Sequence, residues 1–189
     1  MTIGVLALQG SVAEHIKMIK SVNKKIDTVM VRTIDDLAAV DGLIIPGGES
    51  TTLRRLIEEF GLFTPIKERI VAGMPVWGTC AGLILLANRI EGEMPCLSVL
   101  DVDVKRNGYG RHSESFVGEG DFDGMYVNMV FIRAPFITRV GDNVTVLAEC
   151  DERPVAVRCN NVLATAFHPE MTRDNRVHKY FCNMVEAKV

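Results

Sequence analysis

Residues 75–87, PVWGTCAGLILLA, change pattern in the middle and decide how the rest of the chain is interpreted. The first part is a short apolar run, typical of a buried parallel strand, and the second has apolar residues at helical spacing. Between them Gly78 and Gly82 flank Cys80 in the form G-x-nucleophile-x-G. Such a sharp turn from strand to helix presents its central side chain at the carboxyl end of the strand. The stretch therefore predicts a strand–helix unit with a reactive cysteine at the turn.

A second interpretation of the same stretch stays open. Cys80 is equally compatible with a small core residue, since free cysteine is often buried. In that case Gly78 and Gly82 serve only to let the helix approach the sheet closely. The pattern alone does not decide between a nucleophile and a packing residue.

The same succession of strand and helix occurs three more times in the first half. Apolar runs at 2–8, 25–32 and 42–46 are followed by segments with helical spacing at 10–22, 33–40 and 50–61. Four such units, the last with its helix at 81–90, predict an α/β fold with a three-layer wound, mostly parallel sheet. From residue 97 onward, strand-like runs are joined by turns without helices, so the second half is β-rich, and a helical stretch at 172–189 closes the chain. No linker interrupts the pattern, and we expect a single domain over 1–189.

The composition excludes several classes of function. The chain has 189 residues, 48% of them apolar, and a formal net charge of −3 at pH 7. Without a basic surplus, binding to nucleic acid or to an anionic membrane is not expected. Residues 1–12 contain no basic leader and no apolar run long enough for a signal peptide or a membrane span. We therefore expect a cytoplasmic protein.

A nucleophilic thiol needs a base, because with a pKa of about 8.5 it is only a few per cent ionised at neutral pH. His168 lies at the end of a strand-like run and is followed by Pro169 and Glu170. Proline biases the preceding residue toward extended geometry, in which residues i and i+2 point the same way, so Glu170 can hold the imidazole. This predicts a triad of Cys80, His168 and Glu170. An ordinary exposed turn remains the alternative for residues 168–170.

The remaining histidines and cysteines are assigned no chemistry. His15, on a predicted amphipathic helix, His112, in a polar turn, and His178, on the last helix, are interpreted as surface or structural residues. The cysteines are odd in number, scattered and without a CxxC pair, so neither a disulfide framework nor a zinc site is expected. Those other than Cys80 are interpreted as packing residues: Cys96, Cys150, Cys159 and Cys182.

A Gly-rich segment, PGGESTT at 46–52, follows one predicted strand and precedes a helix. Gly47 and Gly48 leave backbone N–H groups uncovered at the carboxyl end of a strand, where ligands bind in open α/β sheets. Together with the N–H of Ala81, the residue after the nucleophile, such groups can complete an oxyanion hole. A plain Gly-rich turn or a phosphate loop is the alternative, although the lysine of a P-loop is absent.

Six stretches, in this order and at this spacing, carry a resemblance to the triad-type (class I) glutamine amidotransferases. They are IGVLALQGSVAEH (3–15), DGLIIPGGESTTLRRL (41–56), GTCAGLILLA (78–87), VKRNGYGRHSESF (104–116), FIRAP (131–135) and FHPEMTRDNRVH (167–178). Within that family the chain resembles the glutaminase subunits of pyridoxal 5′-phosphate synthase, along its whole length. The resemblance implies a flavodoxin-like, class I glutamine amidotransferase-like fold.

What the resemblance implies about activity is hydrolysis of L-glutamine to L-glutamate and ammonia. Cys80 would attack the side-chain amide to form a glutamyl thioester, His168 would protonate the departing ammonia, and Glu170 would orient His168. The glutamine-binding residues implied by the same resemblance are Gly47, Gly48, Glu49, Arg106, Ile132 and Arg133, with the N–H groups of Gly48 and Ala81 at the oxyanion. An arginine fork suits the substrate α-carboxylate. No metal and no cofactor are implied.

The resemblance also implies a protein partner. In this family the ammonia passes to a separate (β/α)₈-barrel synthase subunit within a hetero-oligomer, for pyridoxal 5′-phosphate biosynthesis. The segment around Gln9 and Gly10 resembles part of the contact region. Two stretches depart from the family pattern: residues 106–116 vary from it, and residues 118–128 are short for their connection.

Three alternatives stay open. The glutaminase of imidazole glycerol phosphate synthase also uses a cysteine and a His-Pro-Glu, but lacks the Gly-Gly-Glu-Ser pattern and the LQG segment. A cysteine hydrolase or peptidase-like enzyme on a similar sheet would share the turn at Cys80 but act on another substrate. A binding or regulatory subunit with an idle site would keep only the fold, and the presence of all three triad residues counts against it.

Overall fold

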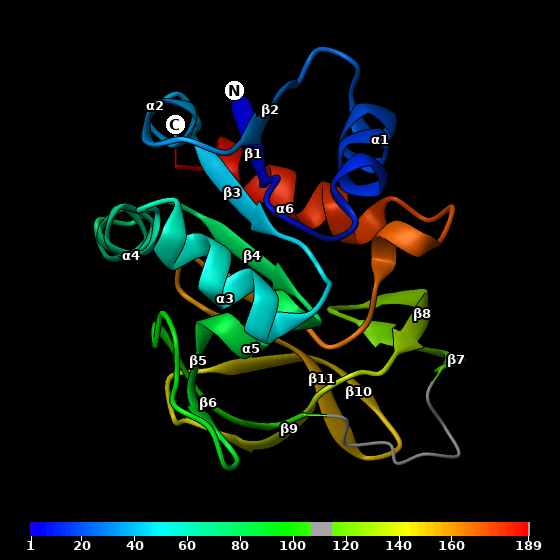
Figure 1. Ribbon diagram of the computed structural model, residues 1–189. Helices are drawn as coiled ribbons and strands as arrows, with labels where there is room; N and C mark the ends of the chain where they lie inside the picture. Colours follow the sequence, from blue (N-terminus) through cyan, green and yellow to red (C-terminus); the bar gives the residue numbers. More distant parts are fainter. Residues whose placement is uncertain (107–114, 189) are drawn as a thin grey trace.

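A nine-stranded sheet organises the computed structural model, which describes residues 1–106 and 115–188 (Figure 1). The strand order is β2-β1-β3-β4-β12-β11-β10-β7-β8. The strands are β1 (Thr2–Leu6), β2 (Asp27–Val31), β3 (Gly42–Ile45), β4 (Val76–Thr79), β7 (Ser115–Phe122), β8 (Met125–Ile132), β10 (Thr145–Cys150), β11 (Arg153–Cys159) and β12 (Val162–Thr165).

The two halves of this sheet differ in strand direction. From β2 to β12 every neighbouring pair is parallel, as expected for strands joined through helices. From β12 to β8 every pair is antiparallel, so the described sheet as a whole is mixed rather than mostly parallel. Tight turns explain the change: Asp123 and Gly124 between β7 and β8 both have positive φ, and so do Asp151 and Glu152 between β10 and β11. Such two-residue turns join only antiparallel strands.

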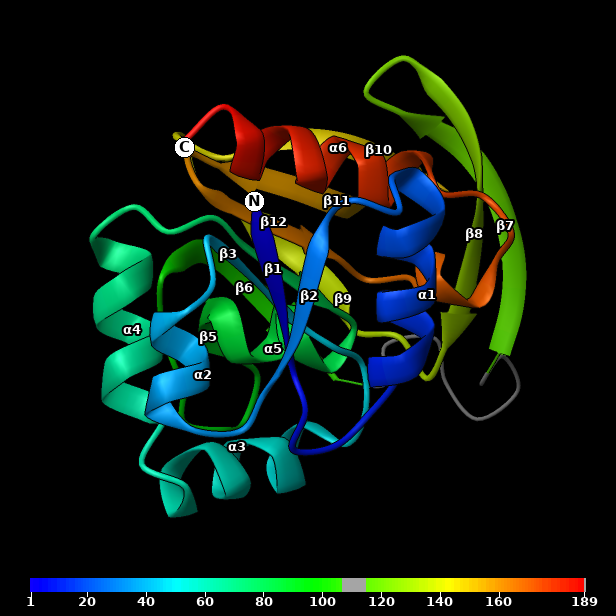
Figure 2. The ribbon, with the colours of Figure 1, turned by 90° about the horizontal axis from the view of Figure 1, so that it is seen from above.

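Helices cover both faces of the parallel half. They are α1 (Val12–Val22), α2 (Ile34–Ala38), α3 (Ser50–Glu59), α4 (Phe63–Val71), α5 (Ala81–Leu86) and α6 (Arg176–Glu186). Figures 1 and 2 show α1 and α6 side by side on one face, with α3 and α5 on the other. The four predicted strand–helix units are confirmed, and so is the closing helix. Helix α4 was not predicted; it buries Ile66 and Ile70 and packs beside α2.

A second, three-stranded sheet lies beyond α5 (Figure 1) and consists of β5 (Ala87–Ile90), β6 (Leu100–Lys105) and β9 (Phe136–Val140). The helix predicted over 81–90 therefore ends at Leu86, because the next four residues pair with β6. Strands β7 and β9 were also not predicted. The stretch at 118–128 that departs from the family pattern forms the turn of the β7–β8 hairpin, which curls away at the sheet edge in Figure 2.

Buried apolar side chains from both halves form one contiguous cluster. Its largest members include Trp77 of β4, Phe122 of β7, Phe131 of β8 and Phe181 of α6. The carboxyl ends of β4 and β12 reach this core next to each other, because the two strands pair directly. The predicted catalytic residues follow these two strand ends. Within the described part of the chain, no helix is long and apolar enough to cross a membrane.

Candidate active site

Cys80 occupies the sharp turn between β4 and α5. Its backbone has φ 47° and ψ −99°, a conformation that residues other than glycine seldom adopt. The Cys80 N–H donates to the carbonyl of Thr165 at the end of β12, with an N···O distance of 2.8 Å. Backbone strain of this kind is found at nucleophile turns, where the surrounding structure holds one side chain in a fixed direction. The conformation agrees with the predicted nucleophile.

Close packing around the two flanking glycines makes this turn possible. A Cβ on Gly78 would lie 2.5 Å from the backbone carbon of Gly82, and a Cβ on Gly82 would lie 2.2 Å from the carbonyl oxygen of Ile45. Both distances are too short for any larger residue. Gly78 and Gly82 therefore allow α5 to approach the sheet closely, as the alternative interpretation held. The same close approach places Cys80 at the end of the strand. The two interpretations are compatible.

His168 and Glu170 form a buried pair directly after β12. His168 Nδ1 lies 2.8 Å from Glu170 Oε1, and the two residues are 6% and 4% exposed. An exposed turn, the alternative drawn from the sequence, is therefore wrong. The predicted extended path from His168 to Glu170 is wrong, although His168 itself is not helical (φ −109°, ψ 83°): Pro169–Met171 form a 3₁₀ turn, and Glu170 reaches back to the ring through that turn.

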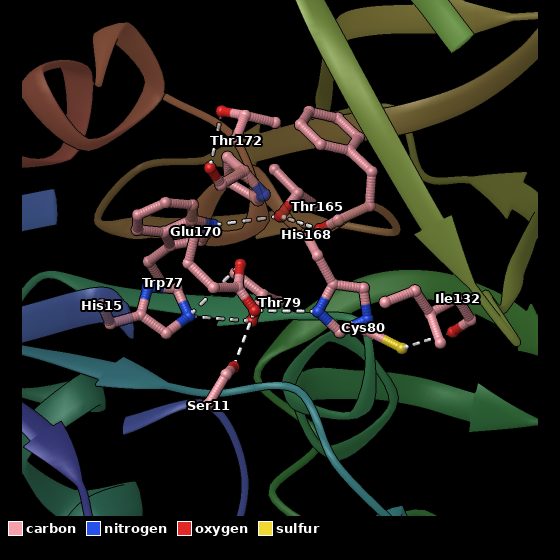
Figure 3. A network of polar contacts seen from close by, with 12 residues as sticks. Ser11, His15, Trp77, Thr79, Cys80, Ile132, Thr165, His168, Glu170 and Thr172 are labelled. Atoms are coloured by element: carbon pink, nitrogen blue, oxygen red, sulfur yellow. Dashed lines mark hydrogen bonds and ion pairs between the residues drawn. The ribbon is translucent and has the colours of Figure 1, made fainter. Parts of the chain in front are cut away.

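The second ring nitrogen of His168 faces Cys80 (Figure 3). Burial lowers the pKa of His168, but hydrogen bonds and charge interactions with Cys80 and Glu170 outweigh it and raise the pKa to about 10. Burial likewise raises the pKa of Glu170, yet contacts with His15, His168 and Ser11 outweigh it and lower that pKa to about 2. The pair is thus arranged to stabilise an imidazolium beside an ionised carboxylate.

These residues open onto a cleft of about 360 Å³, a size suited to a small molecule. The described residues that line it are Gly48, Glu49, Ser50, Cys80, Ile84, Arg106, Ile132, Arg133 and His168. A larger hollow of about 490 Å³ lies against α4, but its lining contains neither cysteine nor histidine. Of these two hollows, the cleft at Cys80 is therefore the candidate active site.

Most of the predicted site residues meet at this cleft, and three lie just behind its lining. Glu170 lies behind His168. Gly47 lies against the His168 ring, because a Cβ on Gly47 would be 2.3 Å from the ring carbon Cε1. Ala81 begins α5 and is buried. At the end of β8, the Ile132 carbonyl accepts from the Cys80 thiol at 3.8 Å.

Two carboxylates hold the predicted substrate arginine. Arg106 Nη2 lies 3.0 Å from Glu49 Oε1, and Arg106 Nη1 lies 2.7 Å from Glu93 Oε1. Glu49 also caps α3 by accepting from the N–H groups of Thr51 and Thr52. Although its slight burial raises the pKa of Glu49, the hydrogen bonds from Thr52 and Thr51 outweigh it and lower that pKa to about 2. In the cleft lining, the positive group of Arg106 and the negative group of Glu49 therefore lie next to each other.

The loop after β1 packs against the Gly-rich segment. The Ser11 N–H donates to the Gly47 carbonyl at 3.3 Å, and the Glu49 N–H donates to the side-chain oxygen of Gln9 at 3.2 Å. The loop and the Gly-rich segment therefore hold each other in place. A conformational change in the loop at Gln9 and Gly10 would therefore shift the predicted oxyanion segment.

Two residues behind the triad were not predicted to belong to the site. His15 and His178 are fully buried and lie in contact, so the surface interpretation of these two is wrong. A signal was present, because His15 shares helical spacing with the buried Met18 and Ile19, as His178 does with Phe181. His112 lies outside the described residues. In residues 1–106 and 115–188, no cluster of three or more potential ligands could hold a metal ion.

Comparison with known proteins gives a consistent result. The model of the SNO glutamine amidotransferase family matches residues 5–187. The chain is 50% identical to the pyridoxal 5′-phosphate synthase subunit PdxT of Mycobacteroides abscessus, over 98% of this chain and 97% of the relative. It is also 50% identical to the subunit of the same name from Geobacillus thermodenitrificans, over 100% and 97% of the two chains.

Solved structures agree with this match. A crystal structure of a glutamine amidotransferase is similar with a TM-score of 0.91 and 42% identity, over 97% of this chain and 98% of that one. The structure of PurLQS from Thermotoga maritima shares the fold at a TM-score of 0.68 and 14% identity, over 99% and 97% of the two chains.

Proposed function

Because the chain belongs to the SNO glutamine amidotransferase family, we propose that its cleft hydrolyses L-glutamine to L-glutamate and ammonia through Cys80. The observation that carries this proposal is the convergence of Cys80, His168 and Glu170 at one cleft, with His168 Nδ1 held 2.8 Å from the Glu170 carboxylate. A thiol, a base and a group that orients the base are what covalent hydrolysis of an amide requires.

The first half of the reaction forms a thioester. The Cys80 sulfur attacks the side-chain amide carbon of glutamine while His168 holds the thiol proton. As the tetrahedral intermediate collapses, the carbon–nitrogen bond breaks, and His168 gives its proton to the leaving nitrogen, which departs as ammonia. The N–H groups of Gly48 and Ala81 are proposed to stabilise the oxyanion, and each such donor typically contributes about 3 kcal/mol to the transition state.

The second half restores the enzyme. Water loses a proton to His168 and attacks the thioester carbon, the carbon–sulfur bond breaks, and the proton returns to the sulfur. Glutamate then leaves. Glu170 keeps the same ring nitrogen of His168 protonated throughout, so the opposite nitrogen is free to carry each proton in turn.

The charges of the cleft fit the amino-acid end of the substrate. Glutamine carries an ammonium and a carboxylate on its α-carbon, and the cleft lining carries Glu49 and Arg106 side by side. We assign the substrate carboxylate to Arg106, whose planar fork suits it, and place Gly47, Ile132 and Arg133 around the same site.

The relatives named as subunits of pyridoxal 5′-phosphate synthase support a partner. In our proposal the protein supplies its ammonia to the synthase subunit of that enzyme, a (β/α)₈ barrel, within a hetero-oligomer in the cytoplasm. In the same proposal, residues 1–189 form a single glutamine amidotransferase domain.

The test is glutamate release from glutamine by the purified chain, alone and with its synthase subunit. Cys80→Ala is the control, because removing the sulfur leaves a small residue that fits the turn. Release that disappears in Cys80→Ala and rises with the partner is the expected result. Release that persists in Cys80→Ala would remove Cys80 as the nucleophile, and cleavage of peptides without turnover of glutamine would favour a different cysteine hydrolase.

A further inference from the structure

Behind the triad, buried polar side chains that the mechanism above does not use surround Glu170. Its Oε1 accepts from the Ser11 hydroxyl at 2.7 Å in addition to His168. On its other side, His15 Nε2 lies 3.5 Å from Oε2. His15 Nδ1 in turn lies 3.0 Å from Nε2 of His178. Figure 3 shows Ser11 and His15 on the side of Glu170 that faces away from Cys80.

This region is dry. The side chains of His15 and Glu170 have no exposed surface, and His178 is fully buried as well. The Trp77 ring stands edge-on against both imidazoles, with ring centroids 5.5 Å from His15 and 4.8 Å from His178. Among the described residues, none makes a regular hydrogen bond to Glu170 Oε2, and His15 Nε2 contacts it as an ion pair at 3.5 Å. A buried ionised oxygen needs a donor nearby, and His15 Nε2 is the nitrogen that faces it.

The positions of the ring nitrogens favour one arrangement of protons. With its proton on Nε2, His15 points an N–H at Glu170 and at the hydroxyl of Thr79, 3.3 Å away. His178 Nε2 then donates to His15 Nδ1, and His178 Nδ1 is left as a buried acceptor without a partner among the described residues. The opposite arrangement would point a His15 lone pair at a carboxylate and would bury a His178 N–H without an acceptor. An unpaired donor is the costlier defect.

Both histidines act as neutral donors in this arrangement. Burial lowers the pKa of His15, against the opposing effect of Glu170, and lowers the pKa of His178 well below its usual value. In this arrangement an N–H of His15 faces the carboxylate.

We propose that His15 is a positioning residue of the triad: its Nε2–H holds the second oxygen of Glu170, and His178 fixes the ring protonation that this requires. Glu170 is then held at both oxygens, so the carboxylate cannot rotate away from His168. The inference rests on the proposed function, because the triad is the group that His15 would position.

The test compares two substitutions at one site. His15→Leu removes the donor, whereas His15→Gln keeps an amide N–H near the position of Nε2. We expect His15→Leu to lower kcat for glutamine about 10- to 100-fold with little change in KM, as for a small displacement of a catalytic group. His15→Gln should recover most of that loss.

Ser21→Ala is the matched control on α1: it removes hydrogen bonds to Met18 and Asn175 without touching Glu170.

A second readout does not need glutamine. The rate at which iodoacetamide alkylates Cys80, followed on the Cys80 peptide by mass spectrometry, reports how well His168 activates the thiol. Slower alkylation in His15→Leu and recovery in His15→Gln would support the inference even if glutamine were not the substrate, in which case the proposed function alone would fail. Wild-type kcat and alkylation in His15→Leu would overturn the inference.

An equal loss in both variants would overturn it as well, because a merely structural histidine predicts no rescue by glutamine. If His15→Leu does not fold, the same comparison is made at His178, which contacts His15. His178→Gln keeps a donor toward His15 and should retain activity, whereas His178→Leu removes it and should lower kcat several-fold. Equal activity in these two variants would contradict the inference.

Discussion

The charged side chains on the two sides of His168 differ in their exposure to solvent. On the cleft side, Arg106 pairs with Glu49 and Glu93, and these three side chains are 28%, 50% and 41% exposed. On the opposite side, Glu170 and His15 are paired without any exposed surface. Ion pairs in contact with water contribute little and exchange readily for the charges of a ligand, whereas buried polar groups are costly to leave unpaired. The cleft side can therefore rearrange around a substrate, while the buried side keeps the catalytic geometry fixed.

The largest effect is expected where the two sides meet, at the nucleophile. Cys80→Ala should abolish glutamine hydrolysis, a loss of at least about 10⁴-fold, because no other group of the cleft can form the thioester. The free energy of unfolding should change by less than about 1 kcal/mol, since alanine fits the turn. Glutamate release and urea denaturation measure the two quantities. A variant that is inactive because it is unfolded would not count as support.

Next in size is the loss of the buried carboxylate. Glu170→Gln should lower kcat by about 10²- to 10⁴-fold, because it changes which proton His168 carries and how the ring is held. A pH–rate profile identical in shape and height to that of the wild type would exclude the assigned role of Glu170.

Glu170 should also make folding stability depend on pH. Its pKa falls from 4.5 to about 2 on folding, so its contribution to stability is present above about pH 4.5 and is lost as the pH falls toward 2. The free energy of unfolding of the wild type, measured in urea at pH 6, 4 and 3, should fall more steeply than that of Glu170→Gln. Parallel curves for the two proteins would contradict this prediction.

A smaller effect is expected at the edge of the buried side. Ser11→Ala removes one donor to Glu170 Oε1 but leaves His168 in place. We expect a loss of about 1.5–3 kcal/mol in unfolding free energy, as for a hydrogen bond to a charged group, and a fall in kcat of several-fold. Chemical denaturation and steady-state kinetics measure both. If Ser11→Ala behaves like Ser21→Ala, the Ser11 hydroxyl does not help to hold the carboxylate.

The smallest effect is expected on the cleft side. Glu93 competes with a substrate carboxylate for Arg106, so Glu93→Gln should lower KM for glutamine by about two- to threefold and leave kcat unchanged. The difference should shrink at high salt, because exposed charges are screened. An increase in KM would show that Glu93 helps to orient Arg106 rather than to occupy it.

Much of the fold was predictable because its signals are local. The runs of apolar residues at 2–8 and 42–46 and the turn at Cys80 depend on neighbours a few positions away, and they predicted the strand–helix units correctly. The rest was less accessible: strand β7 of the antiparallel half and strand β9 of the second sheet were missed, and the predicted helix at 81–90 was too long. At residues 87–90, pairing with β6 overrides the helical spacing of the sequence.

Three chemical groups of the candidate site could be predicted from the chain alone: a cysteine at a sharp turn, a His-Pro-Glu segment and a Gly-rich loop. The arginine was implied only by the family resemblance. What stands behind and beside them follows only from the packing of the folded molecule. Ser11 and Glu170 are 159 positions apart, and His15 and His178 are 163 positions apart. No local pattern encodes such contacts, because they exist only once α1 and α6 pack on the same face of the sheet and exclude water from the carboxylate between them.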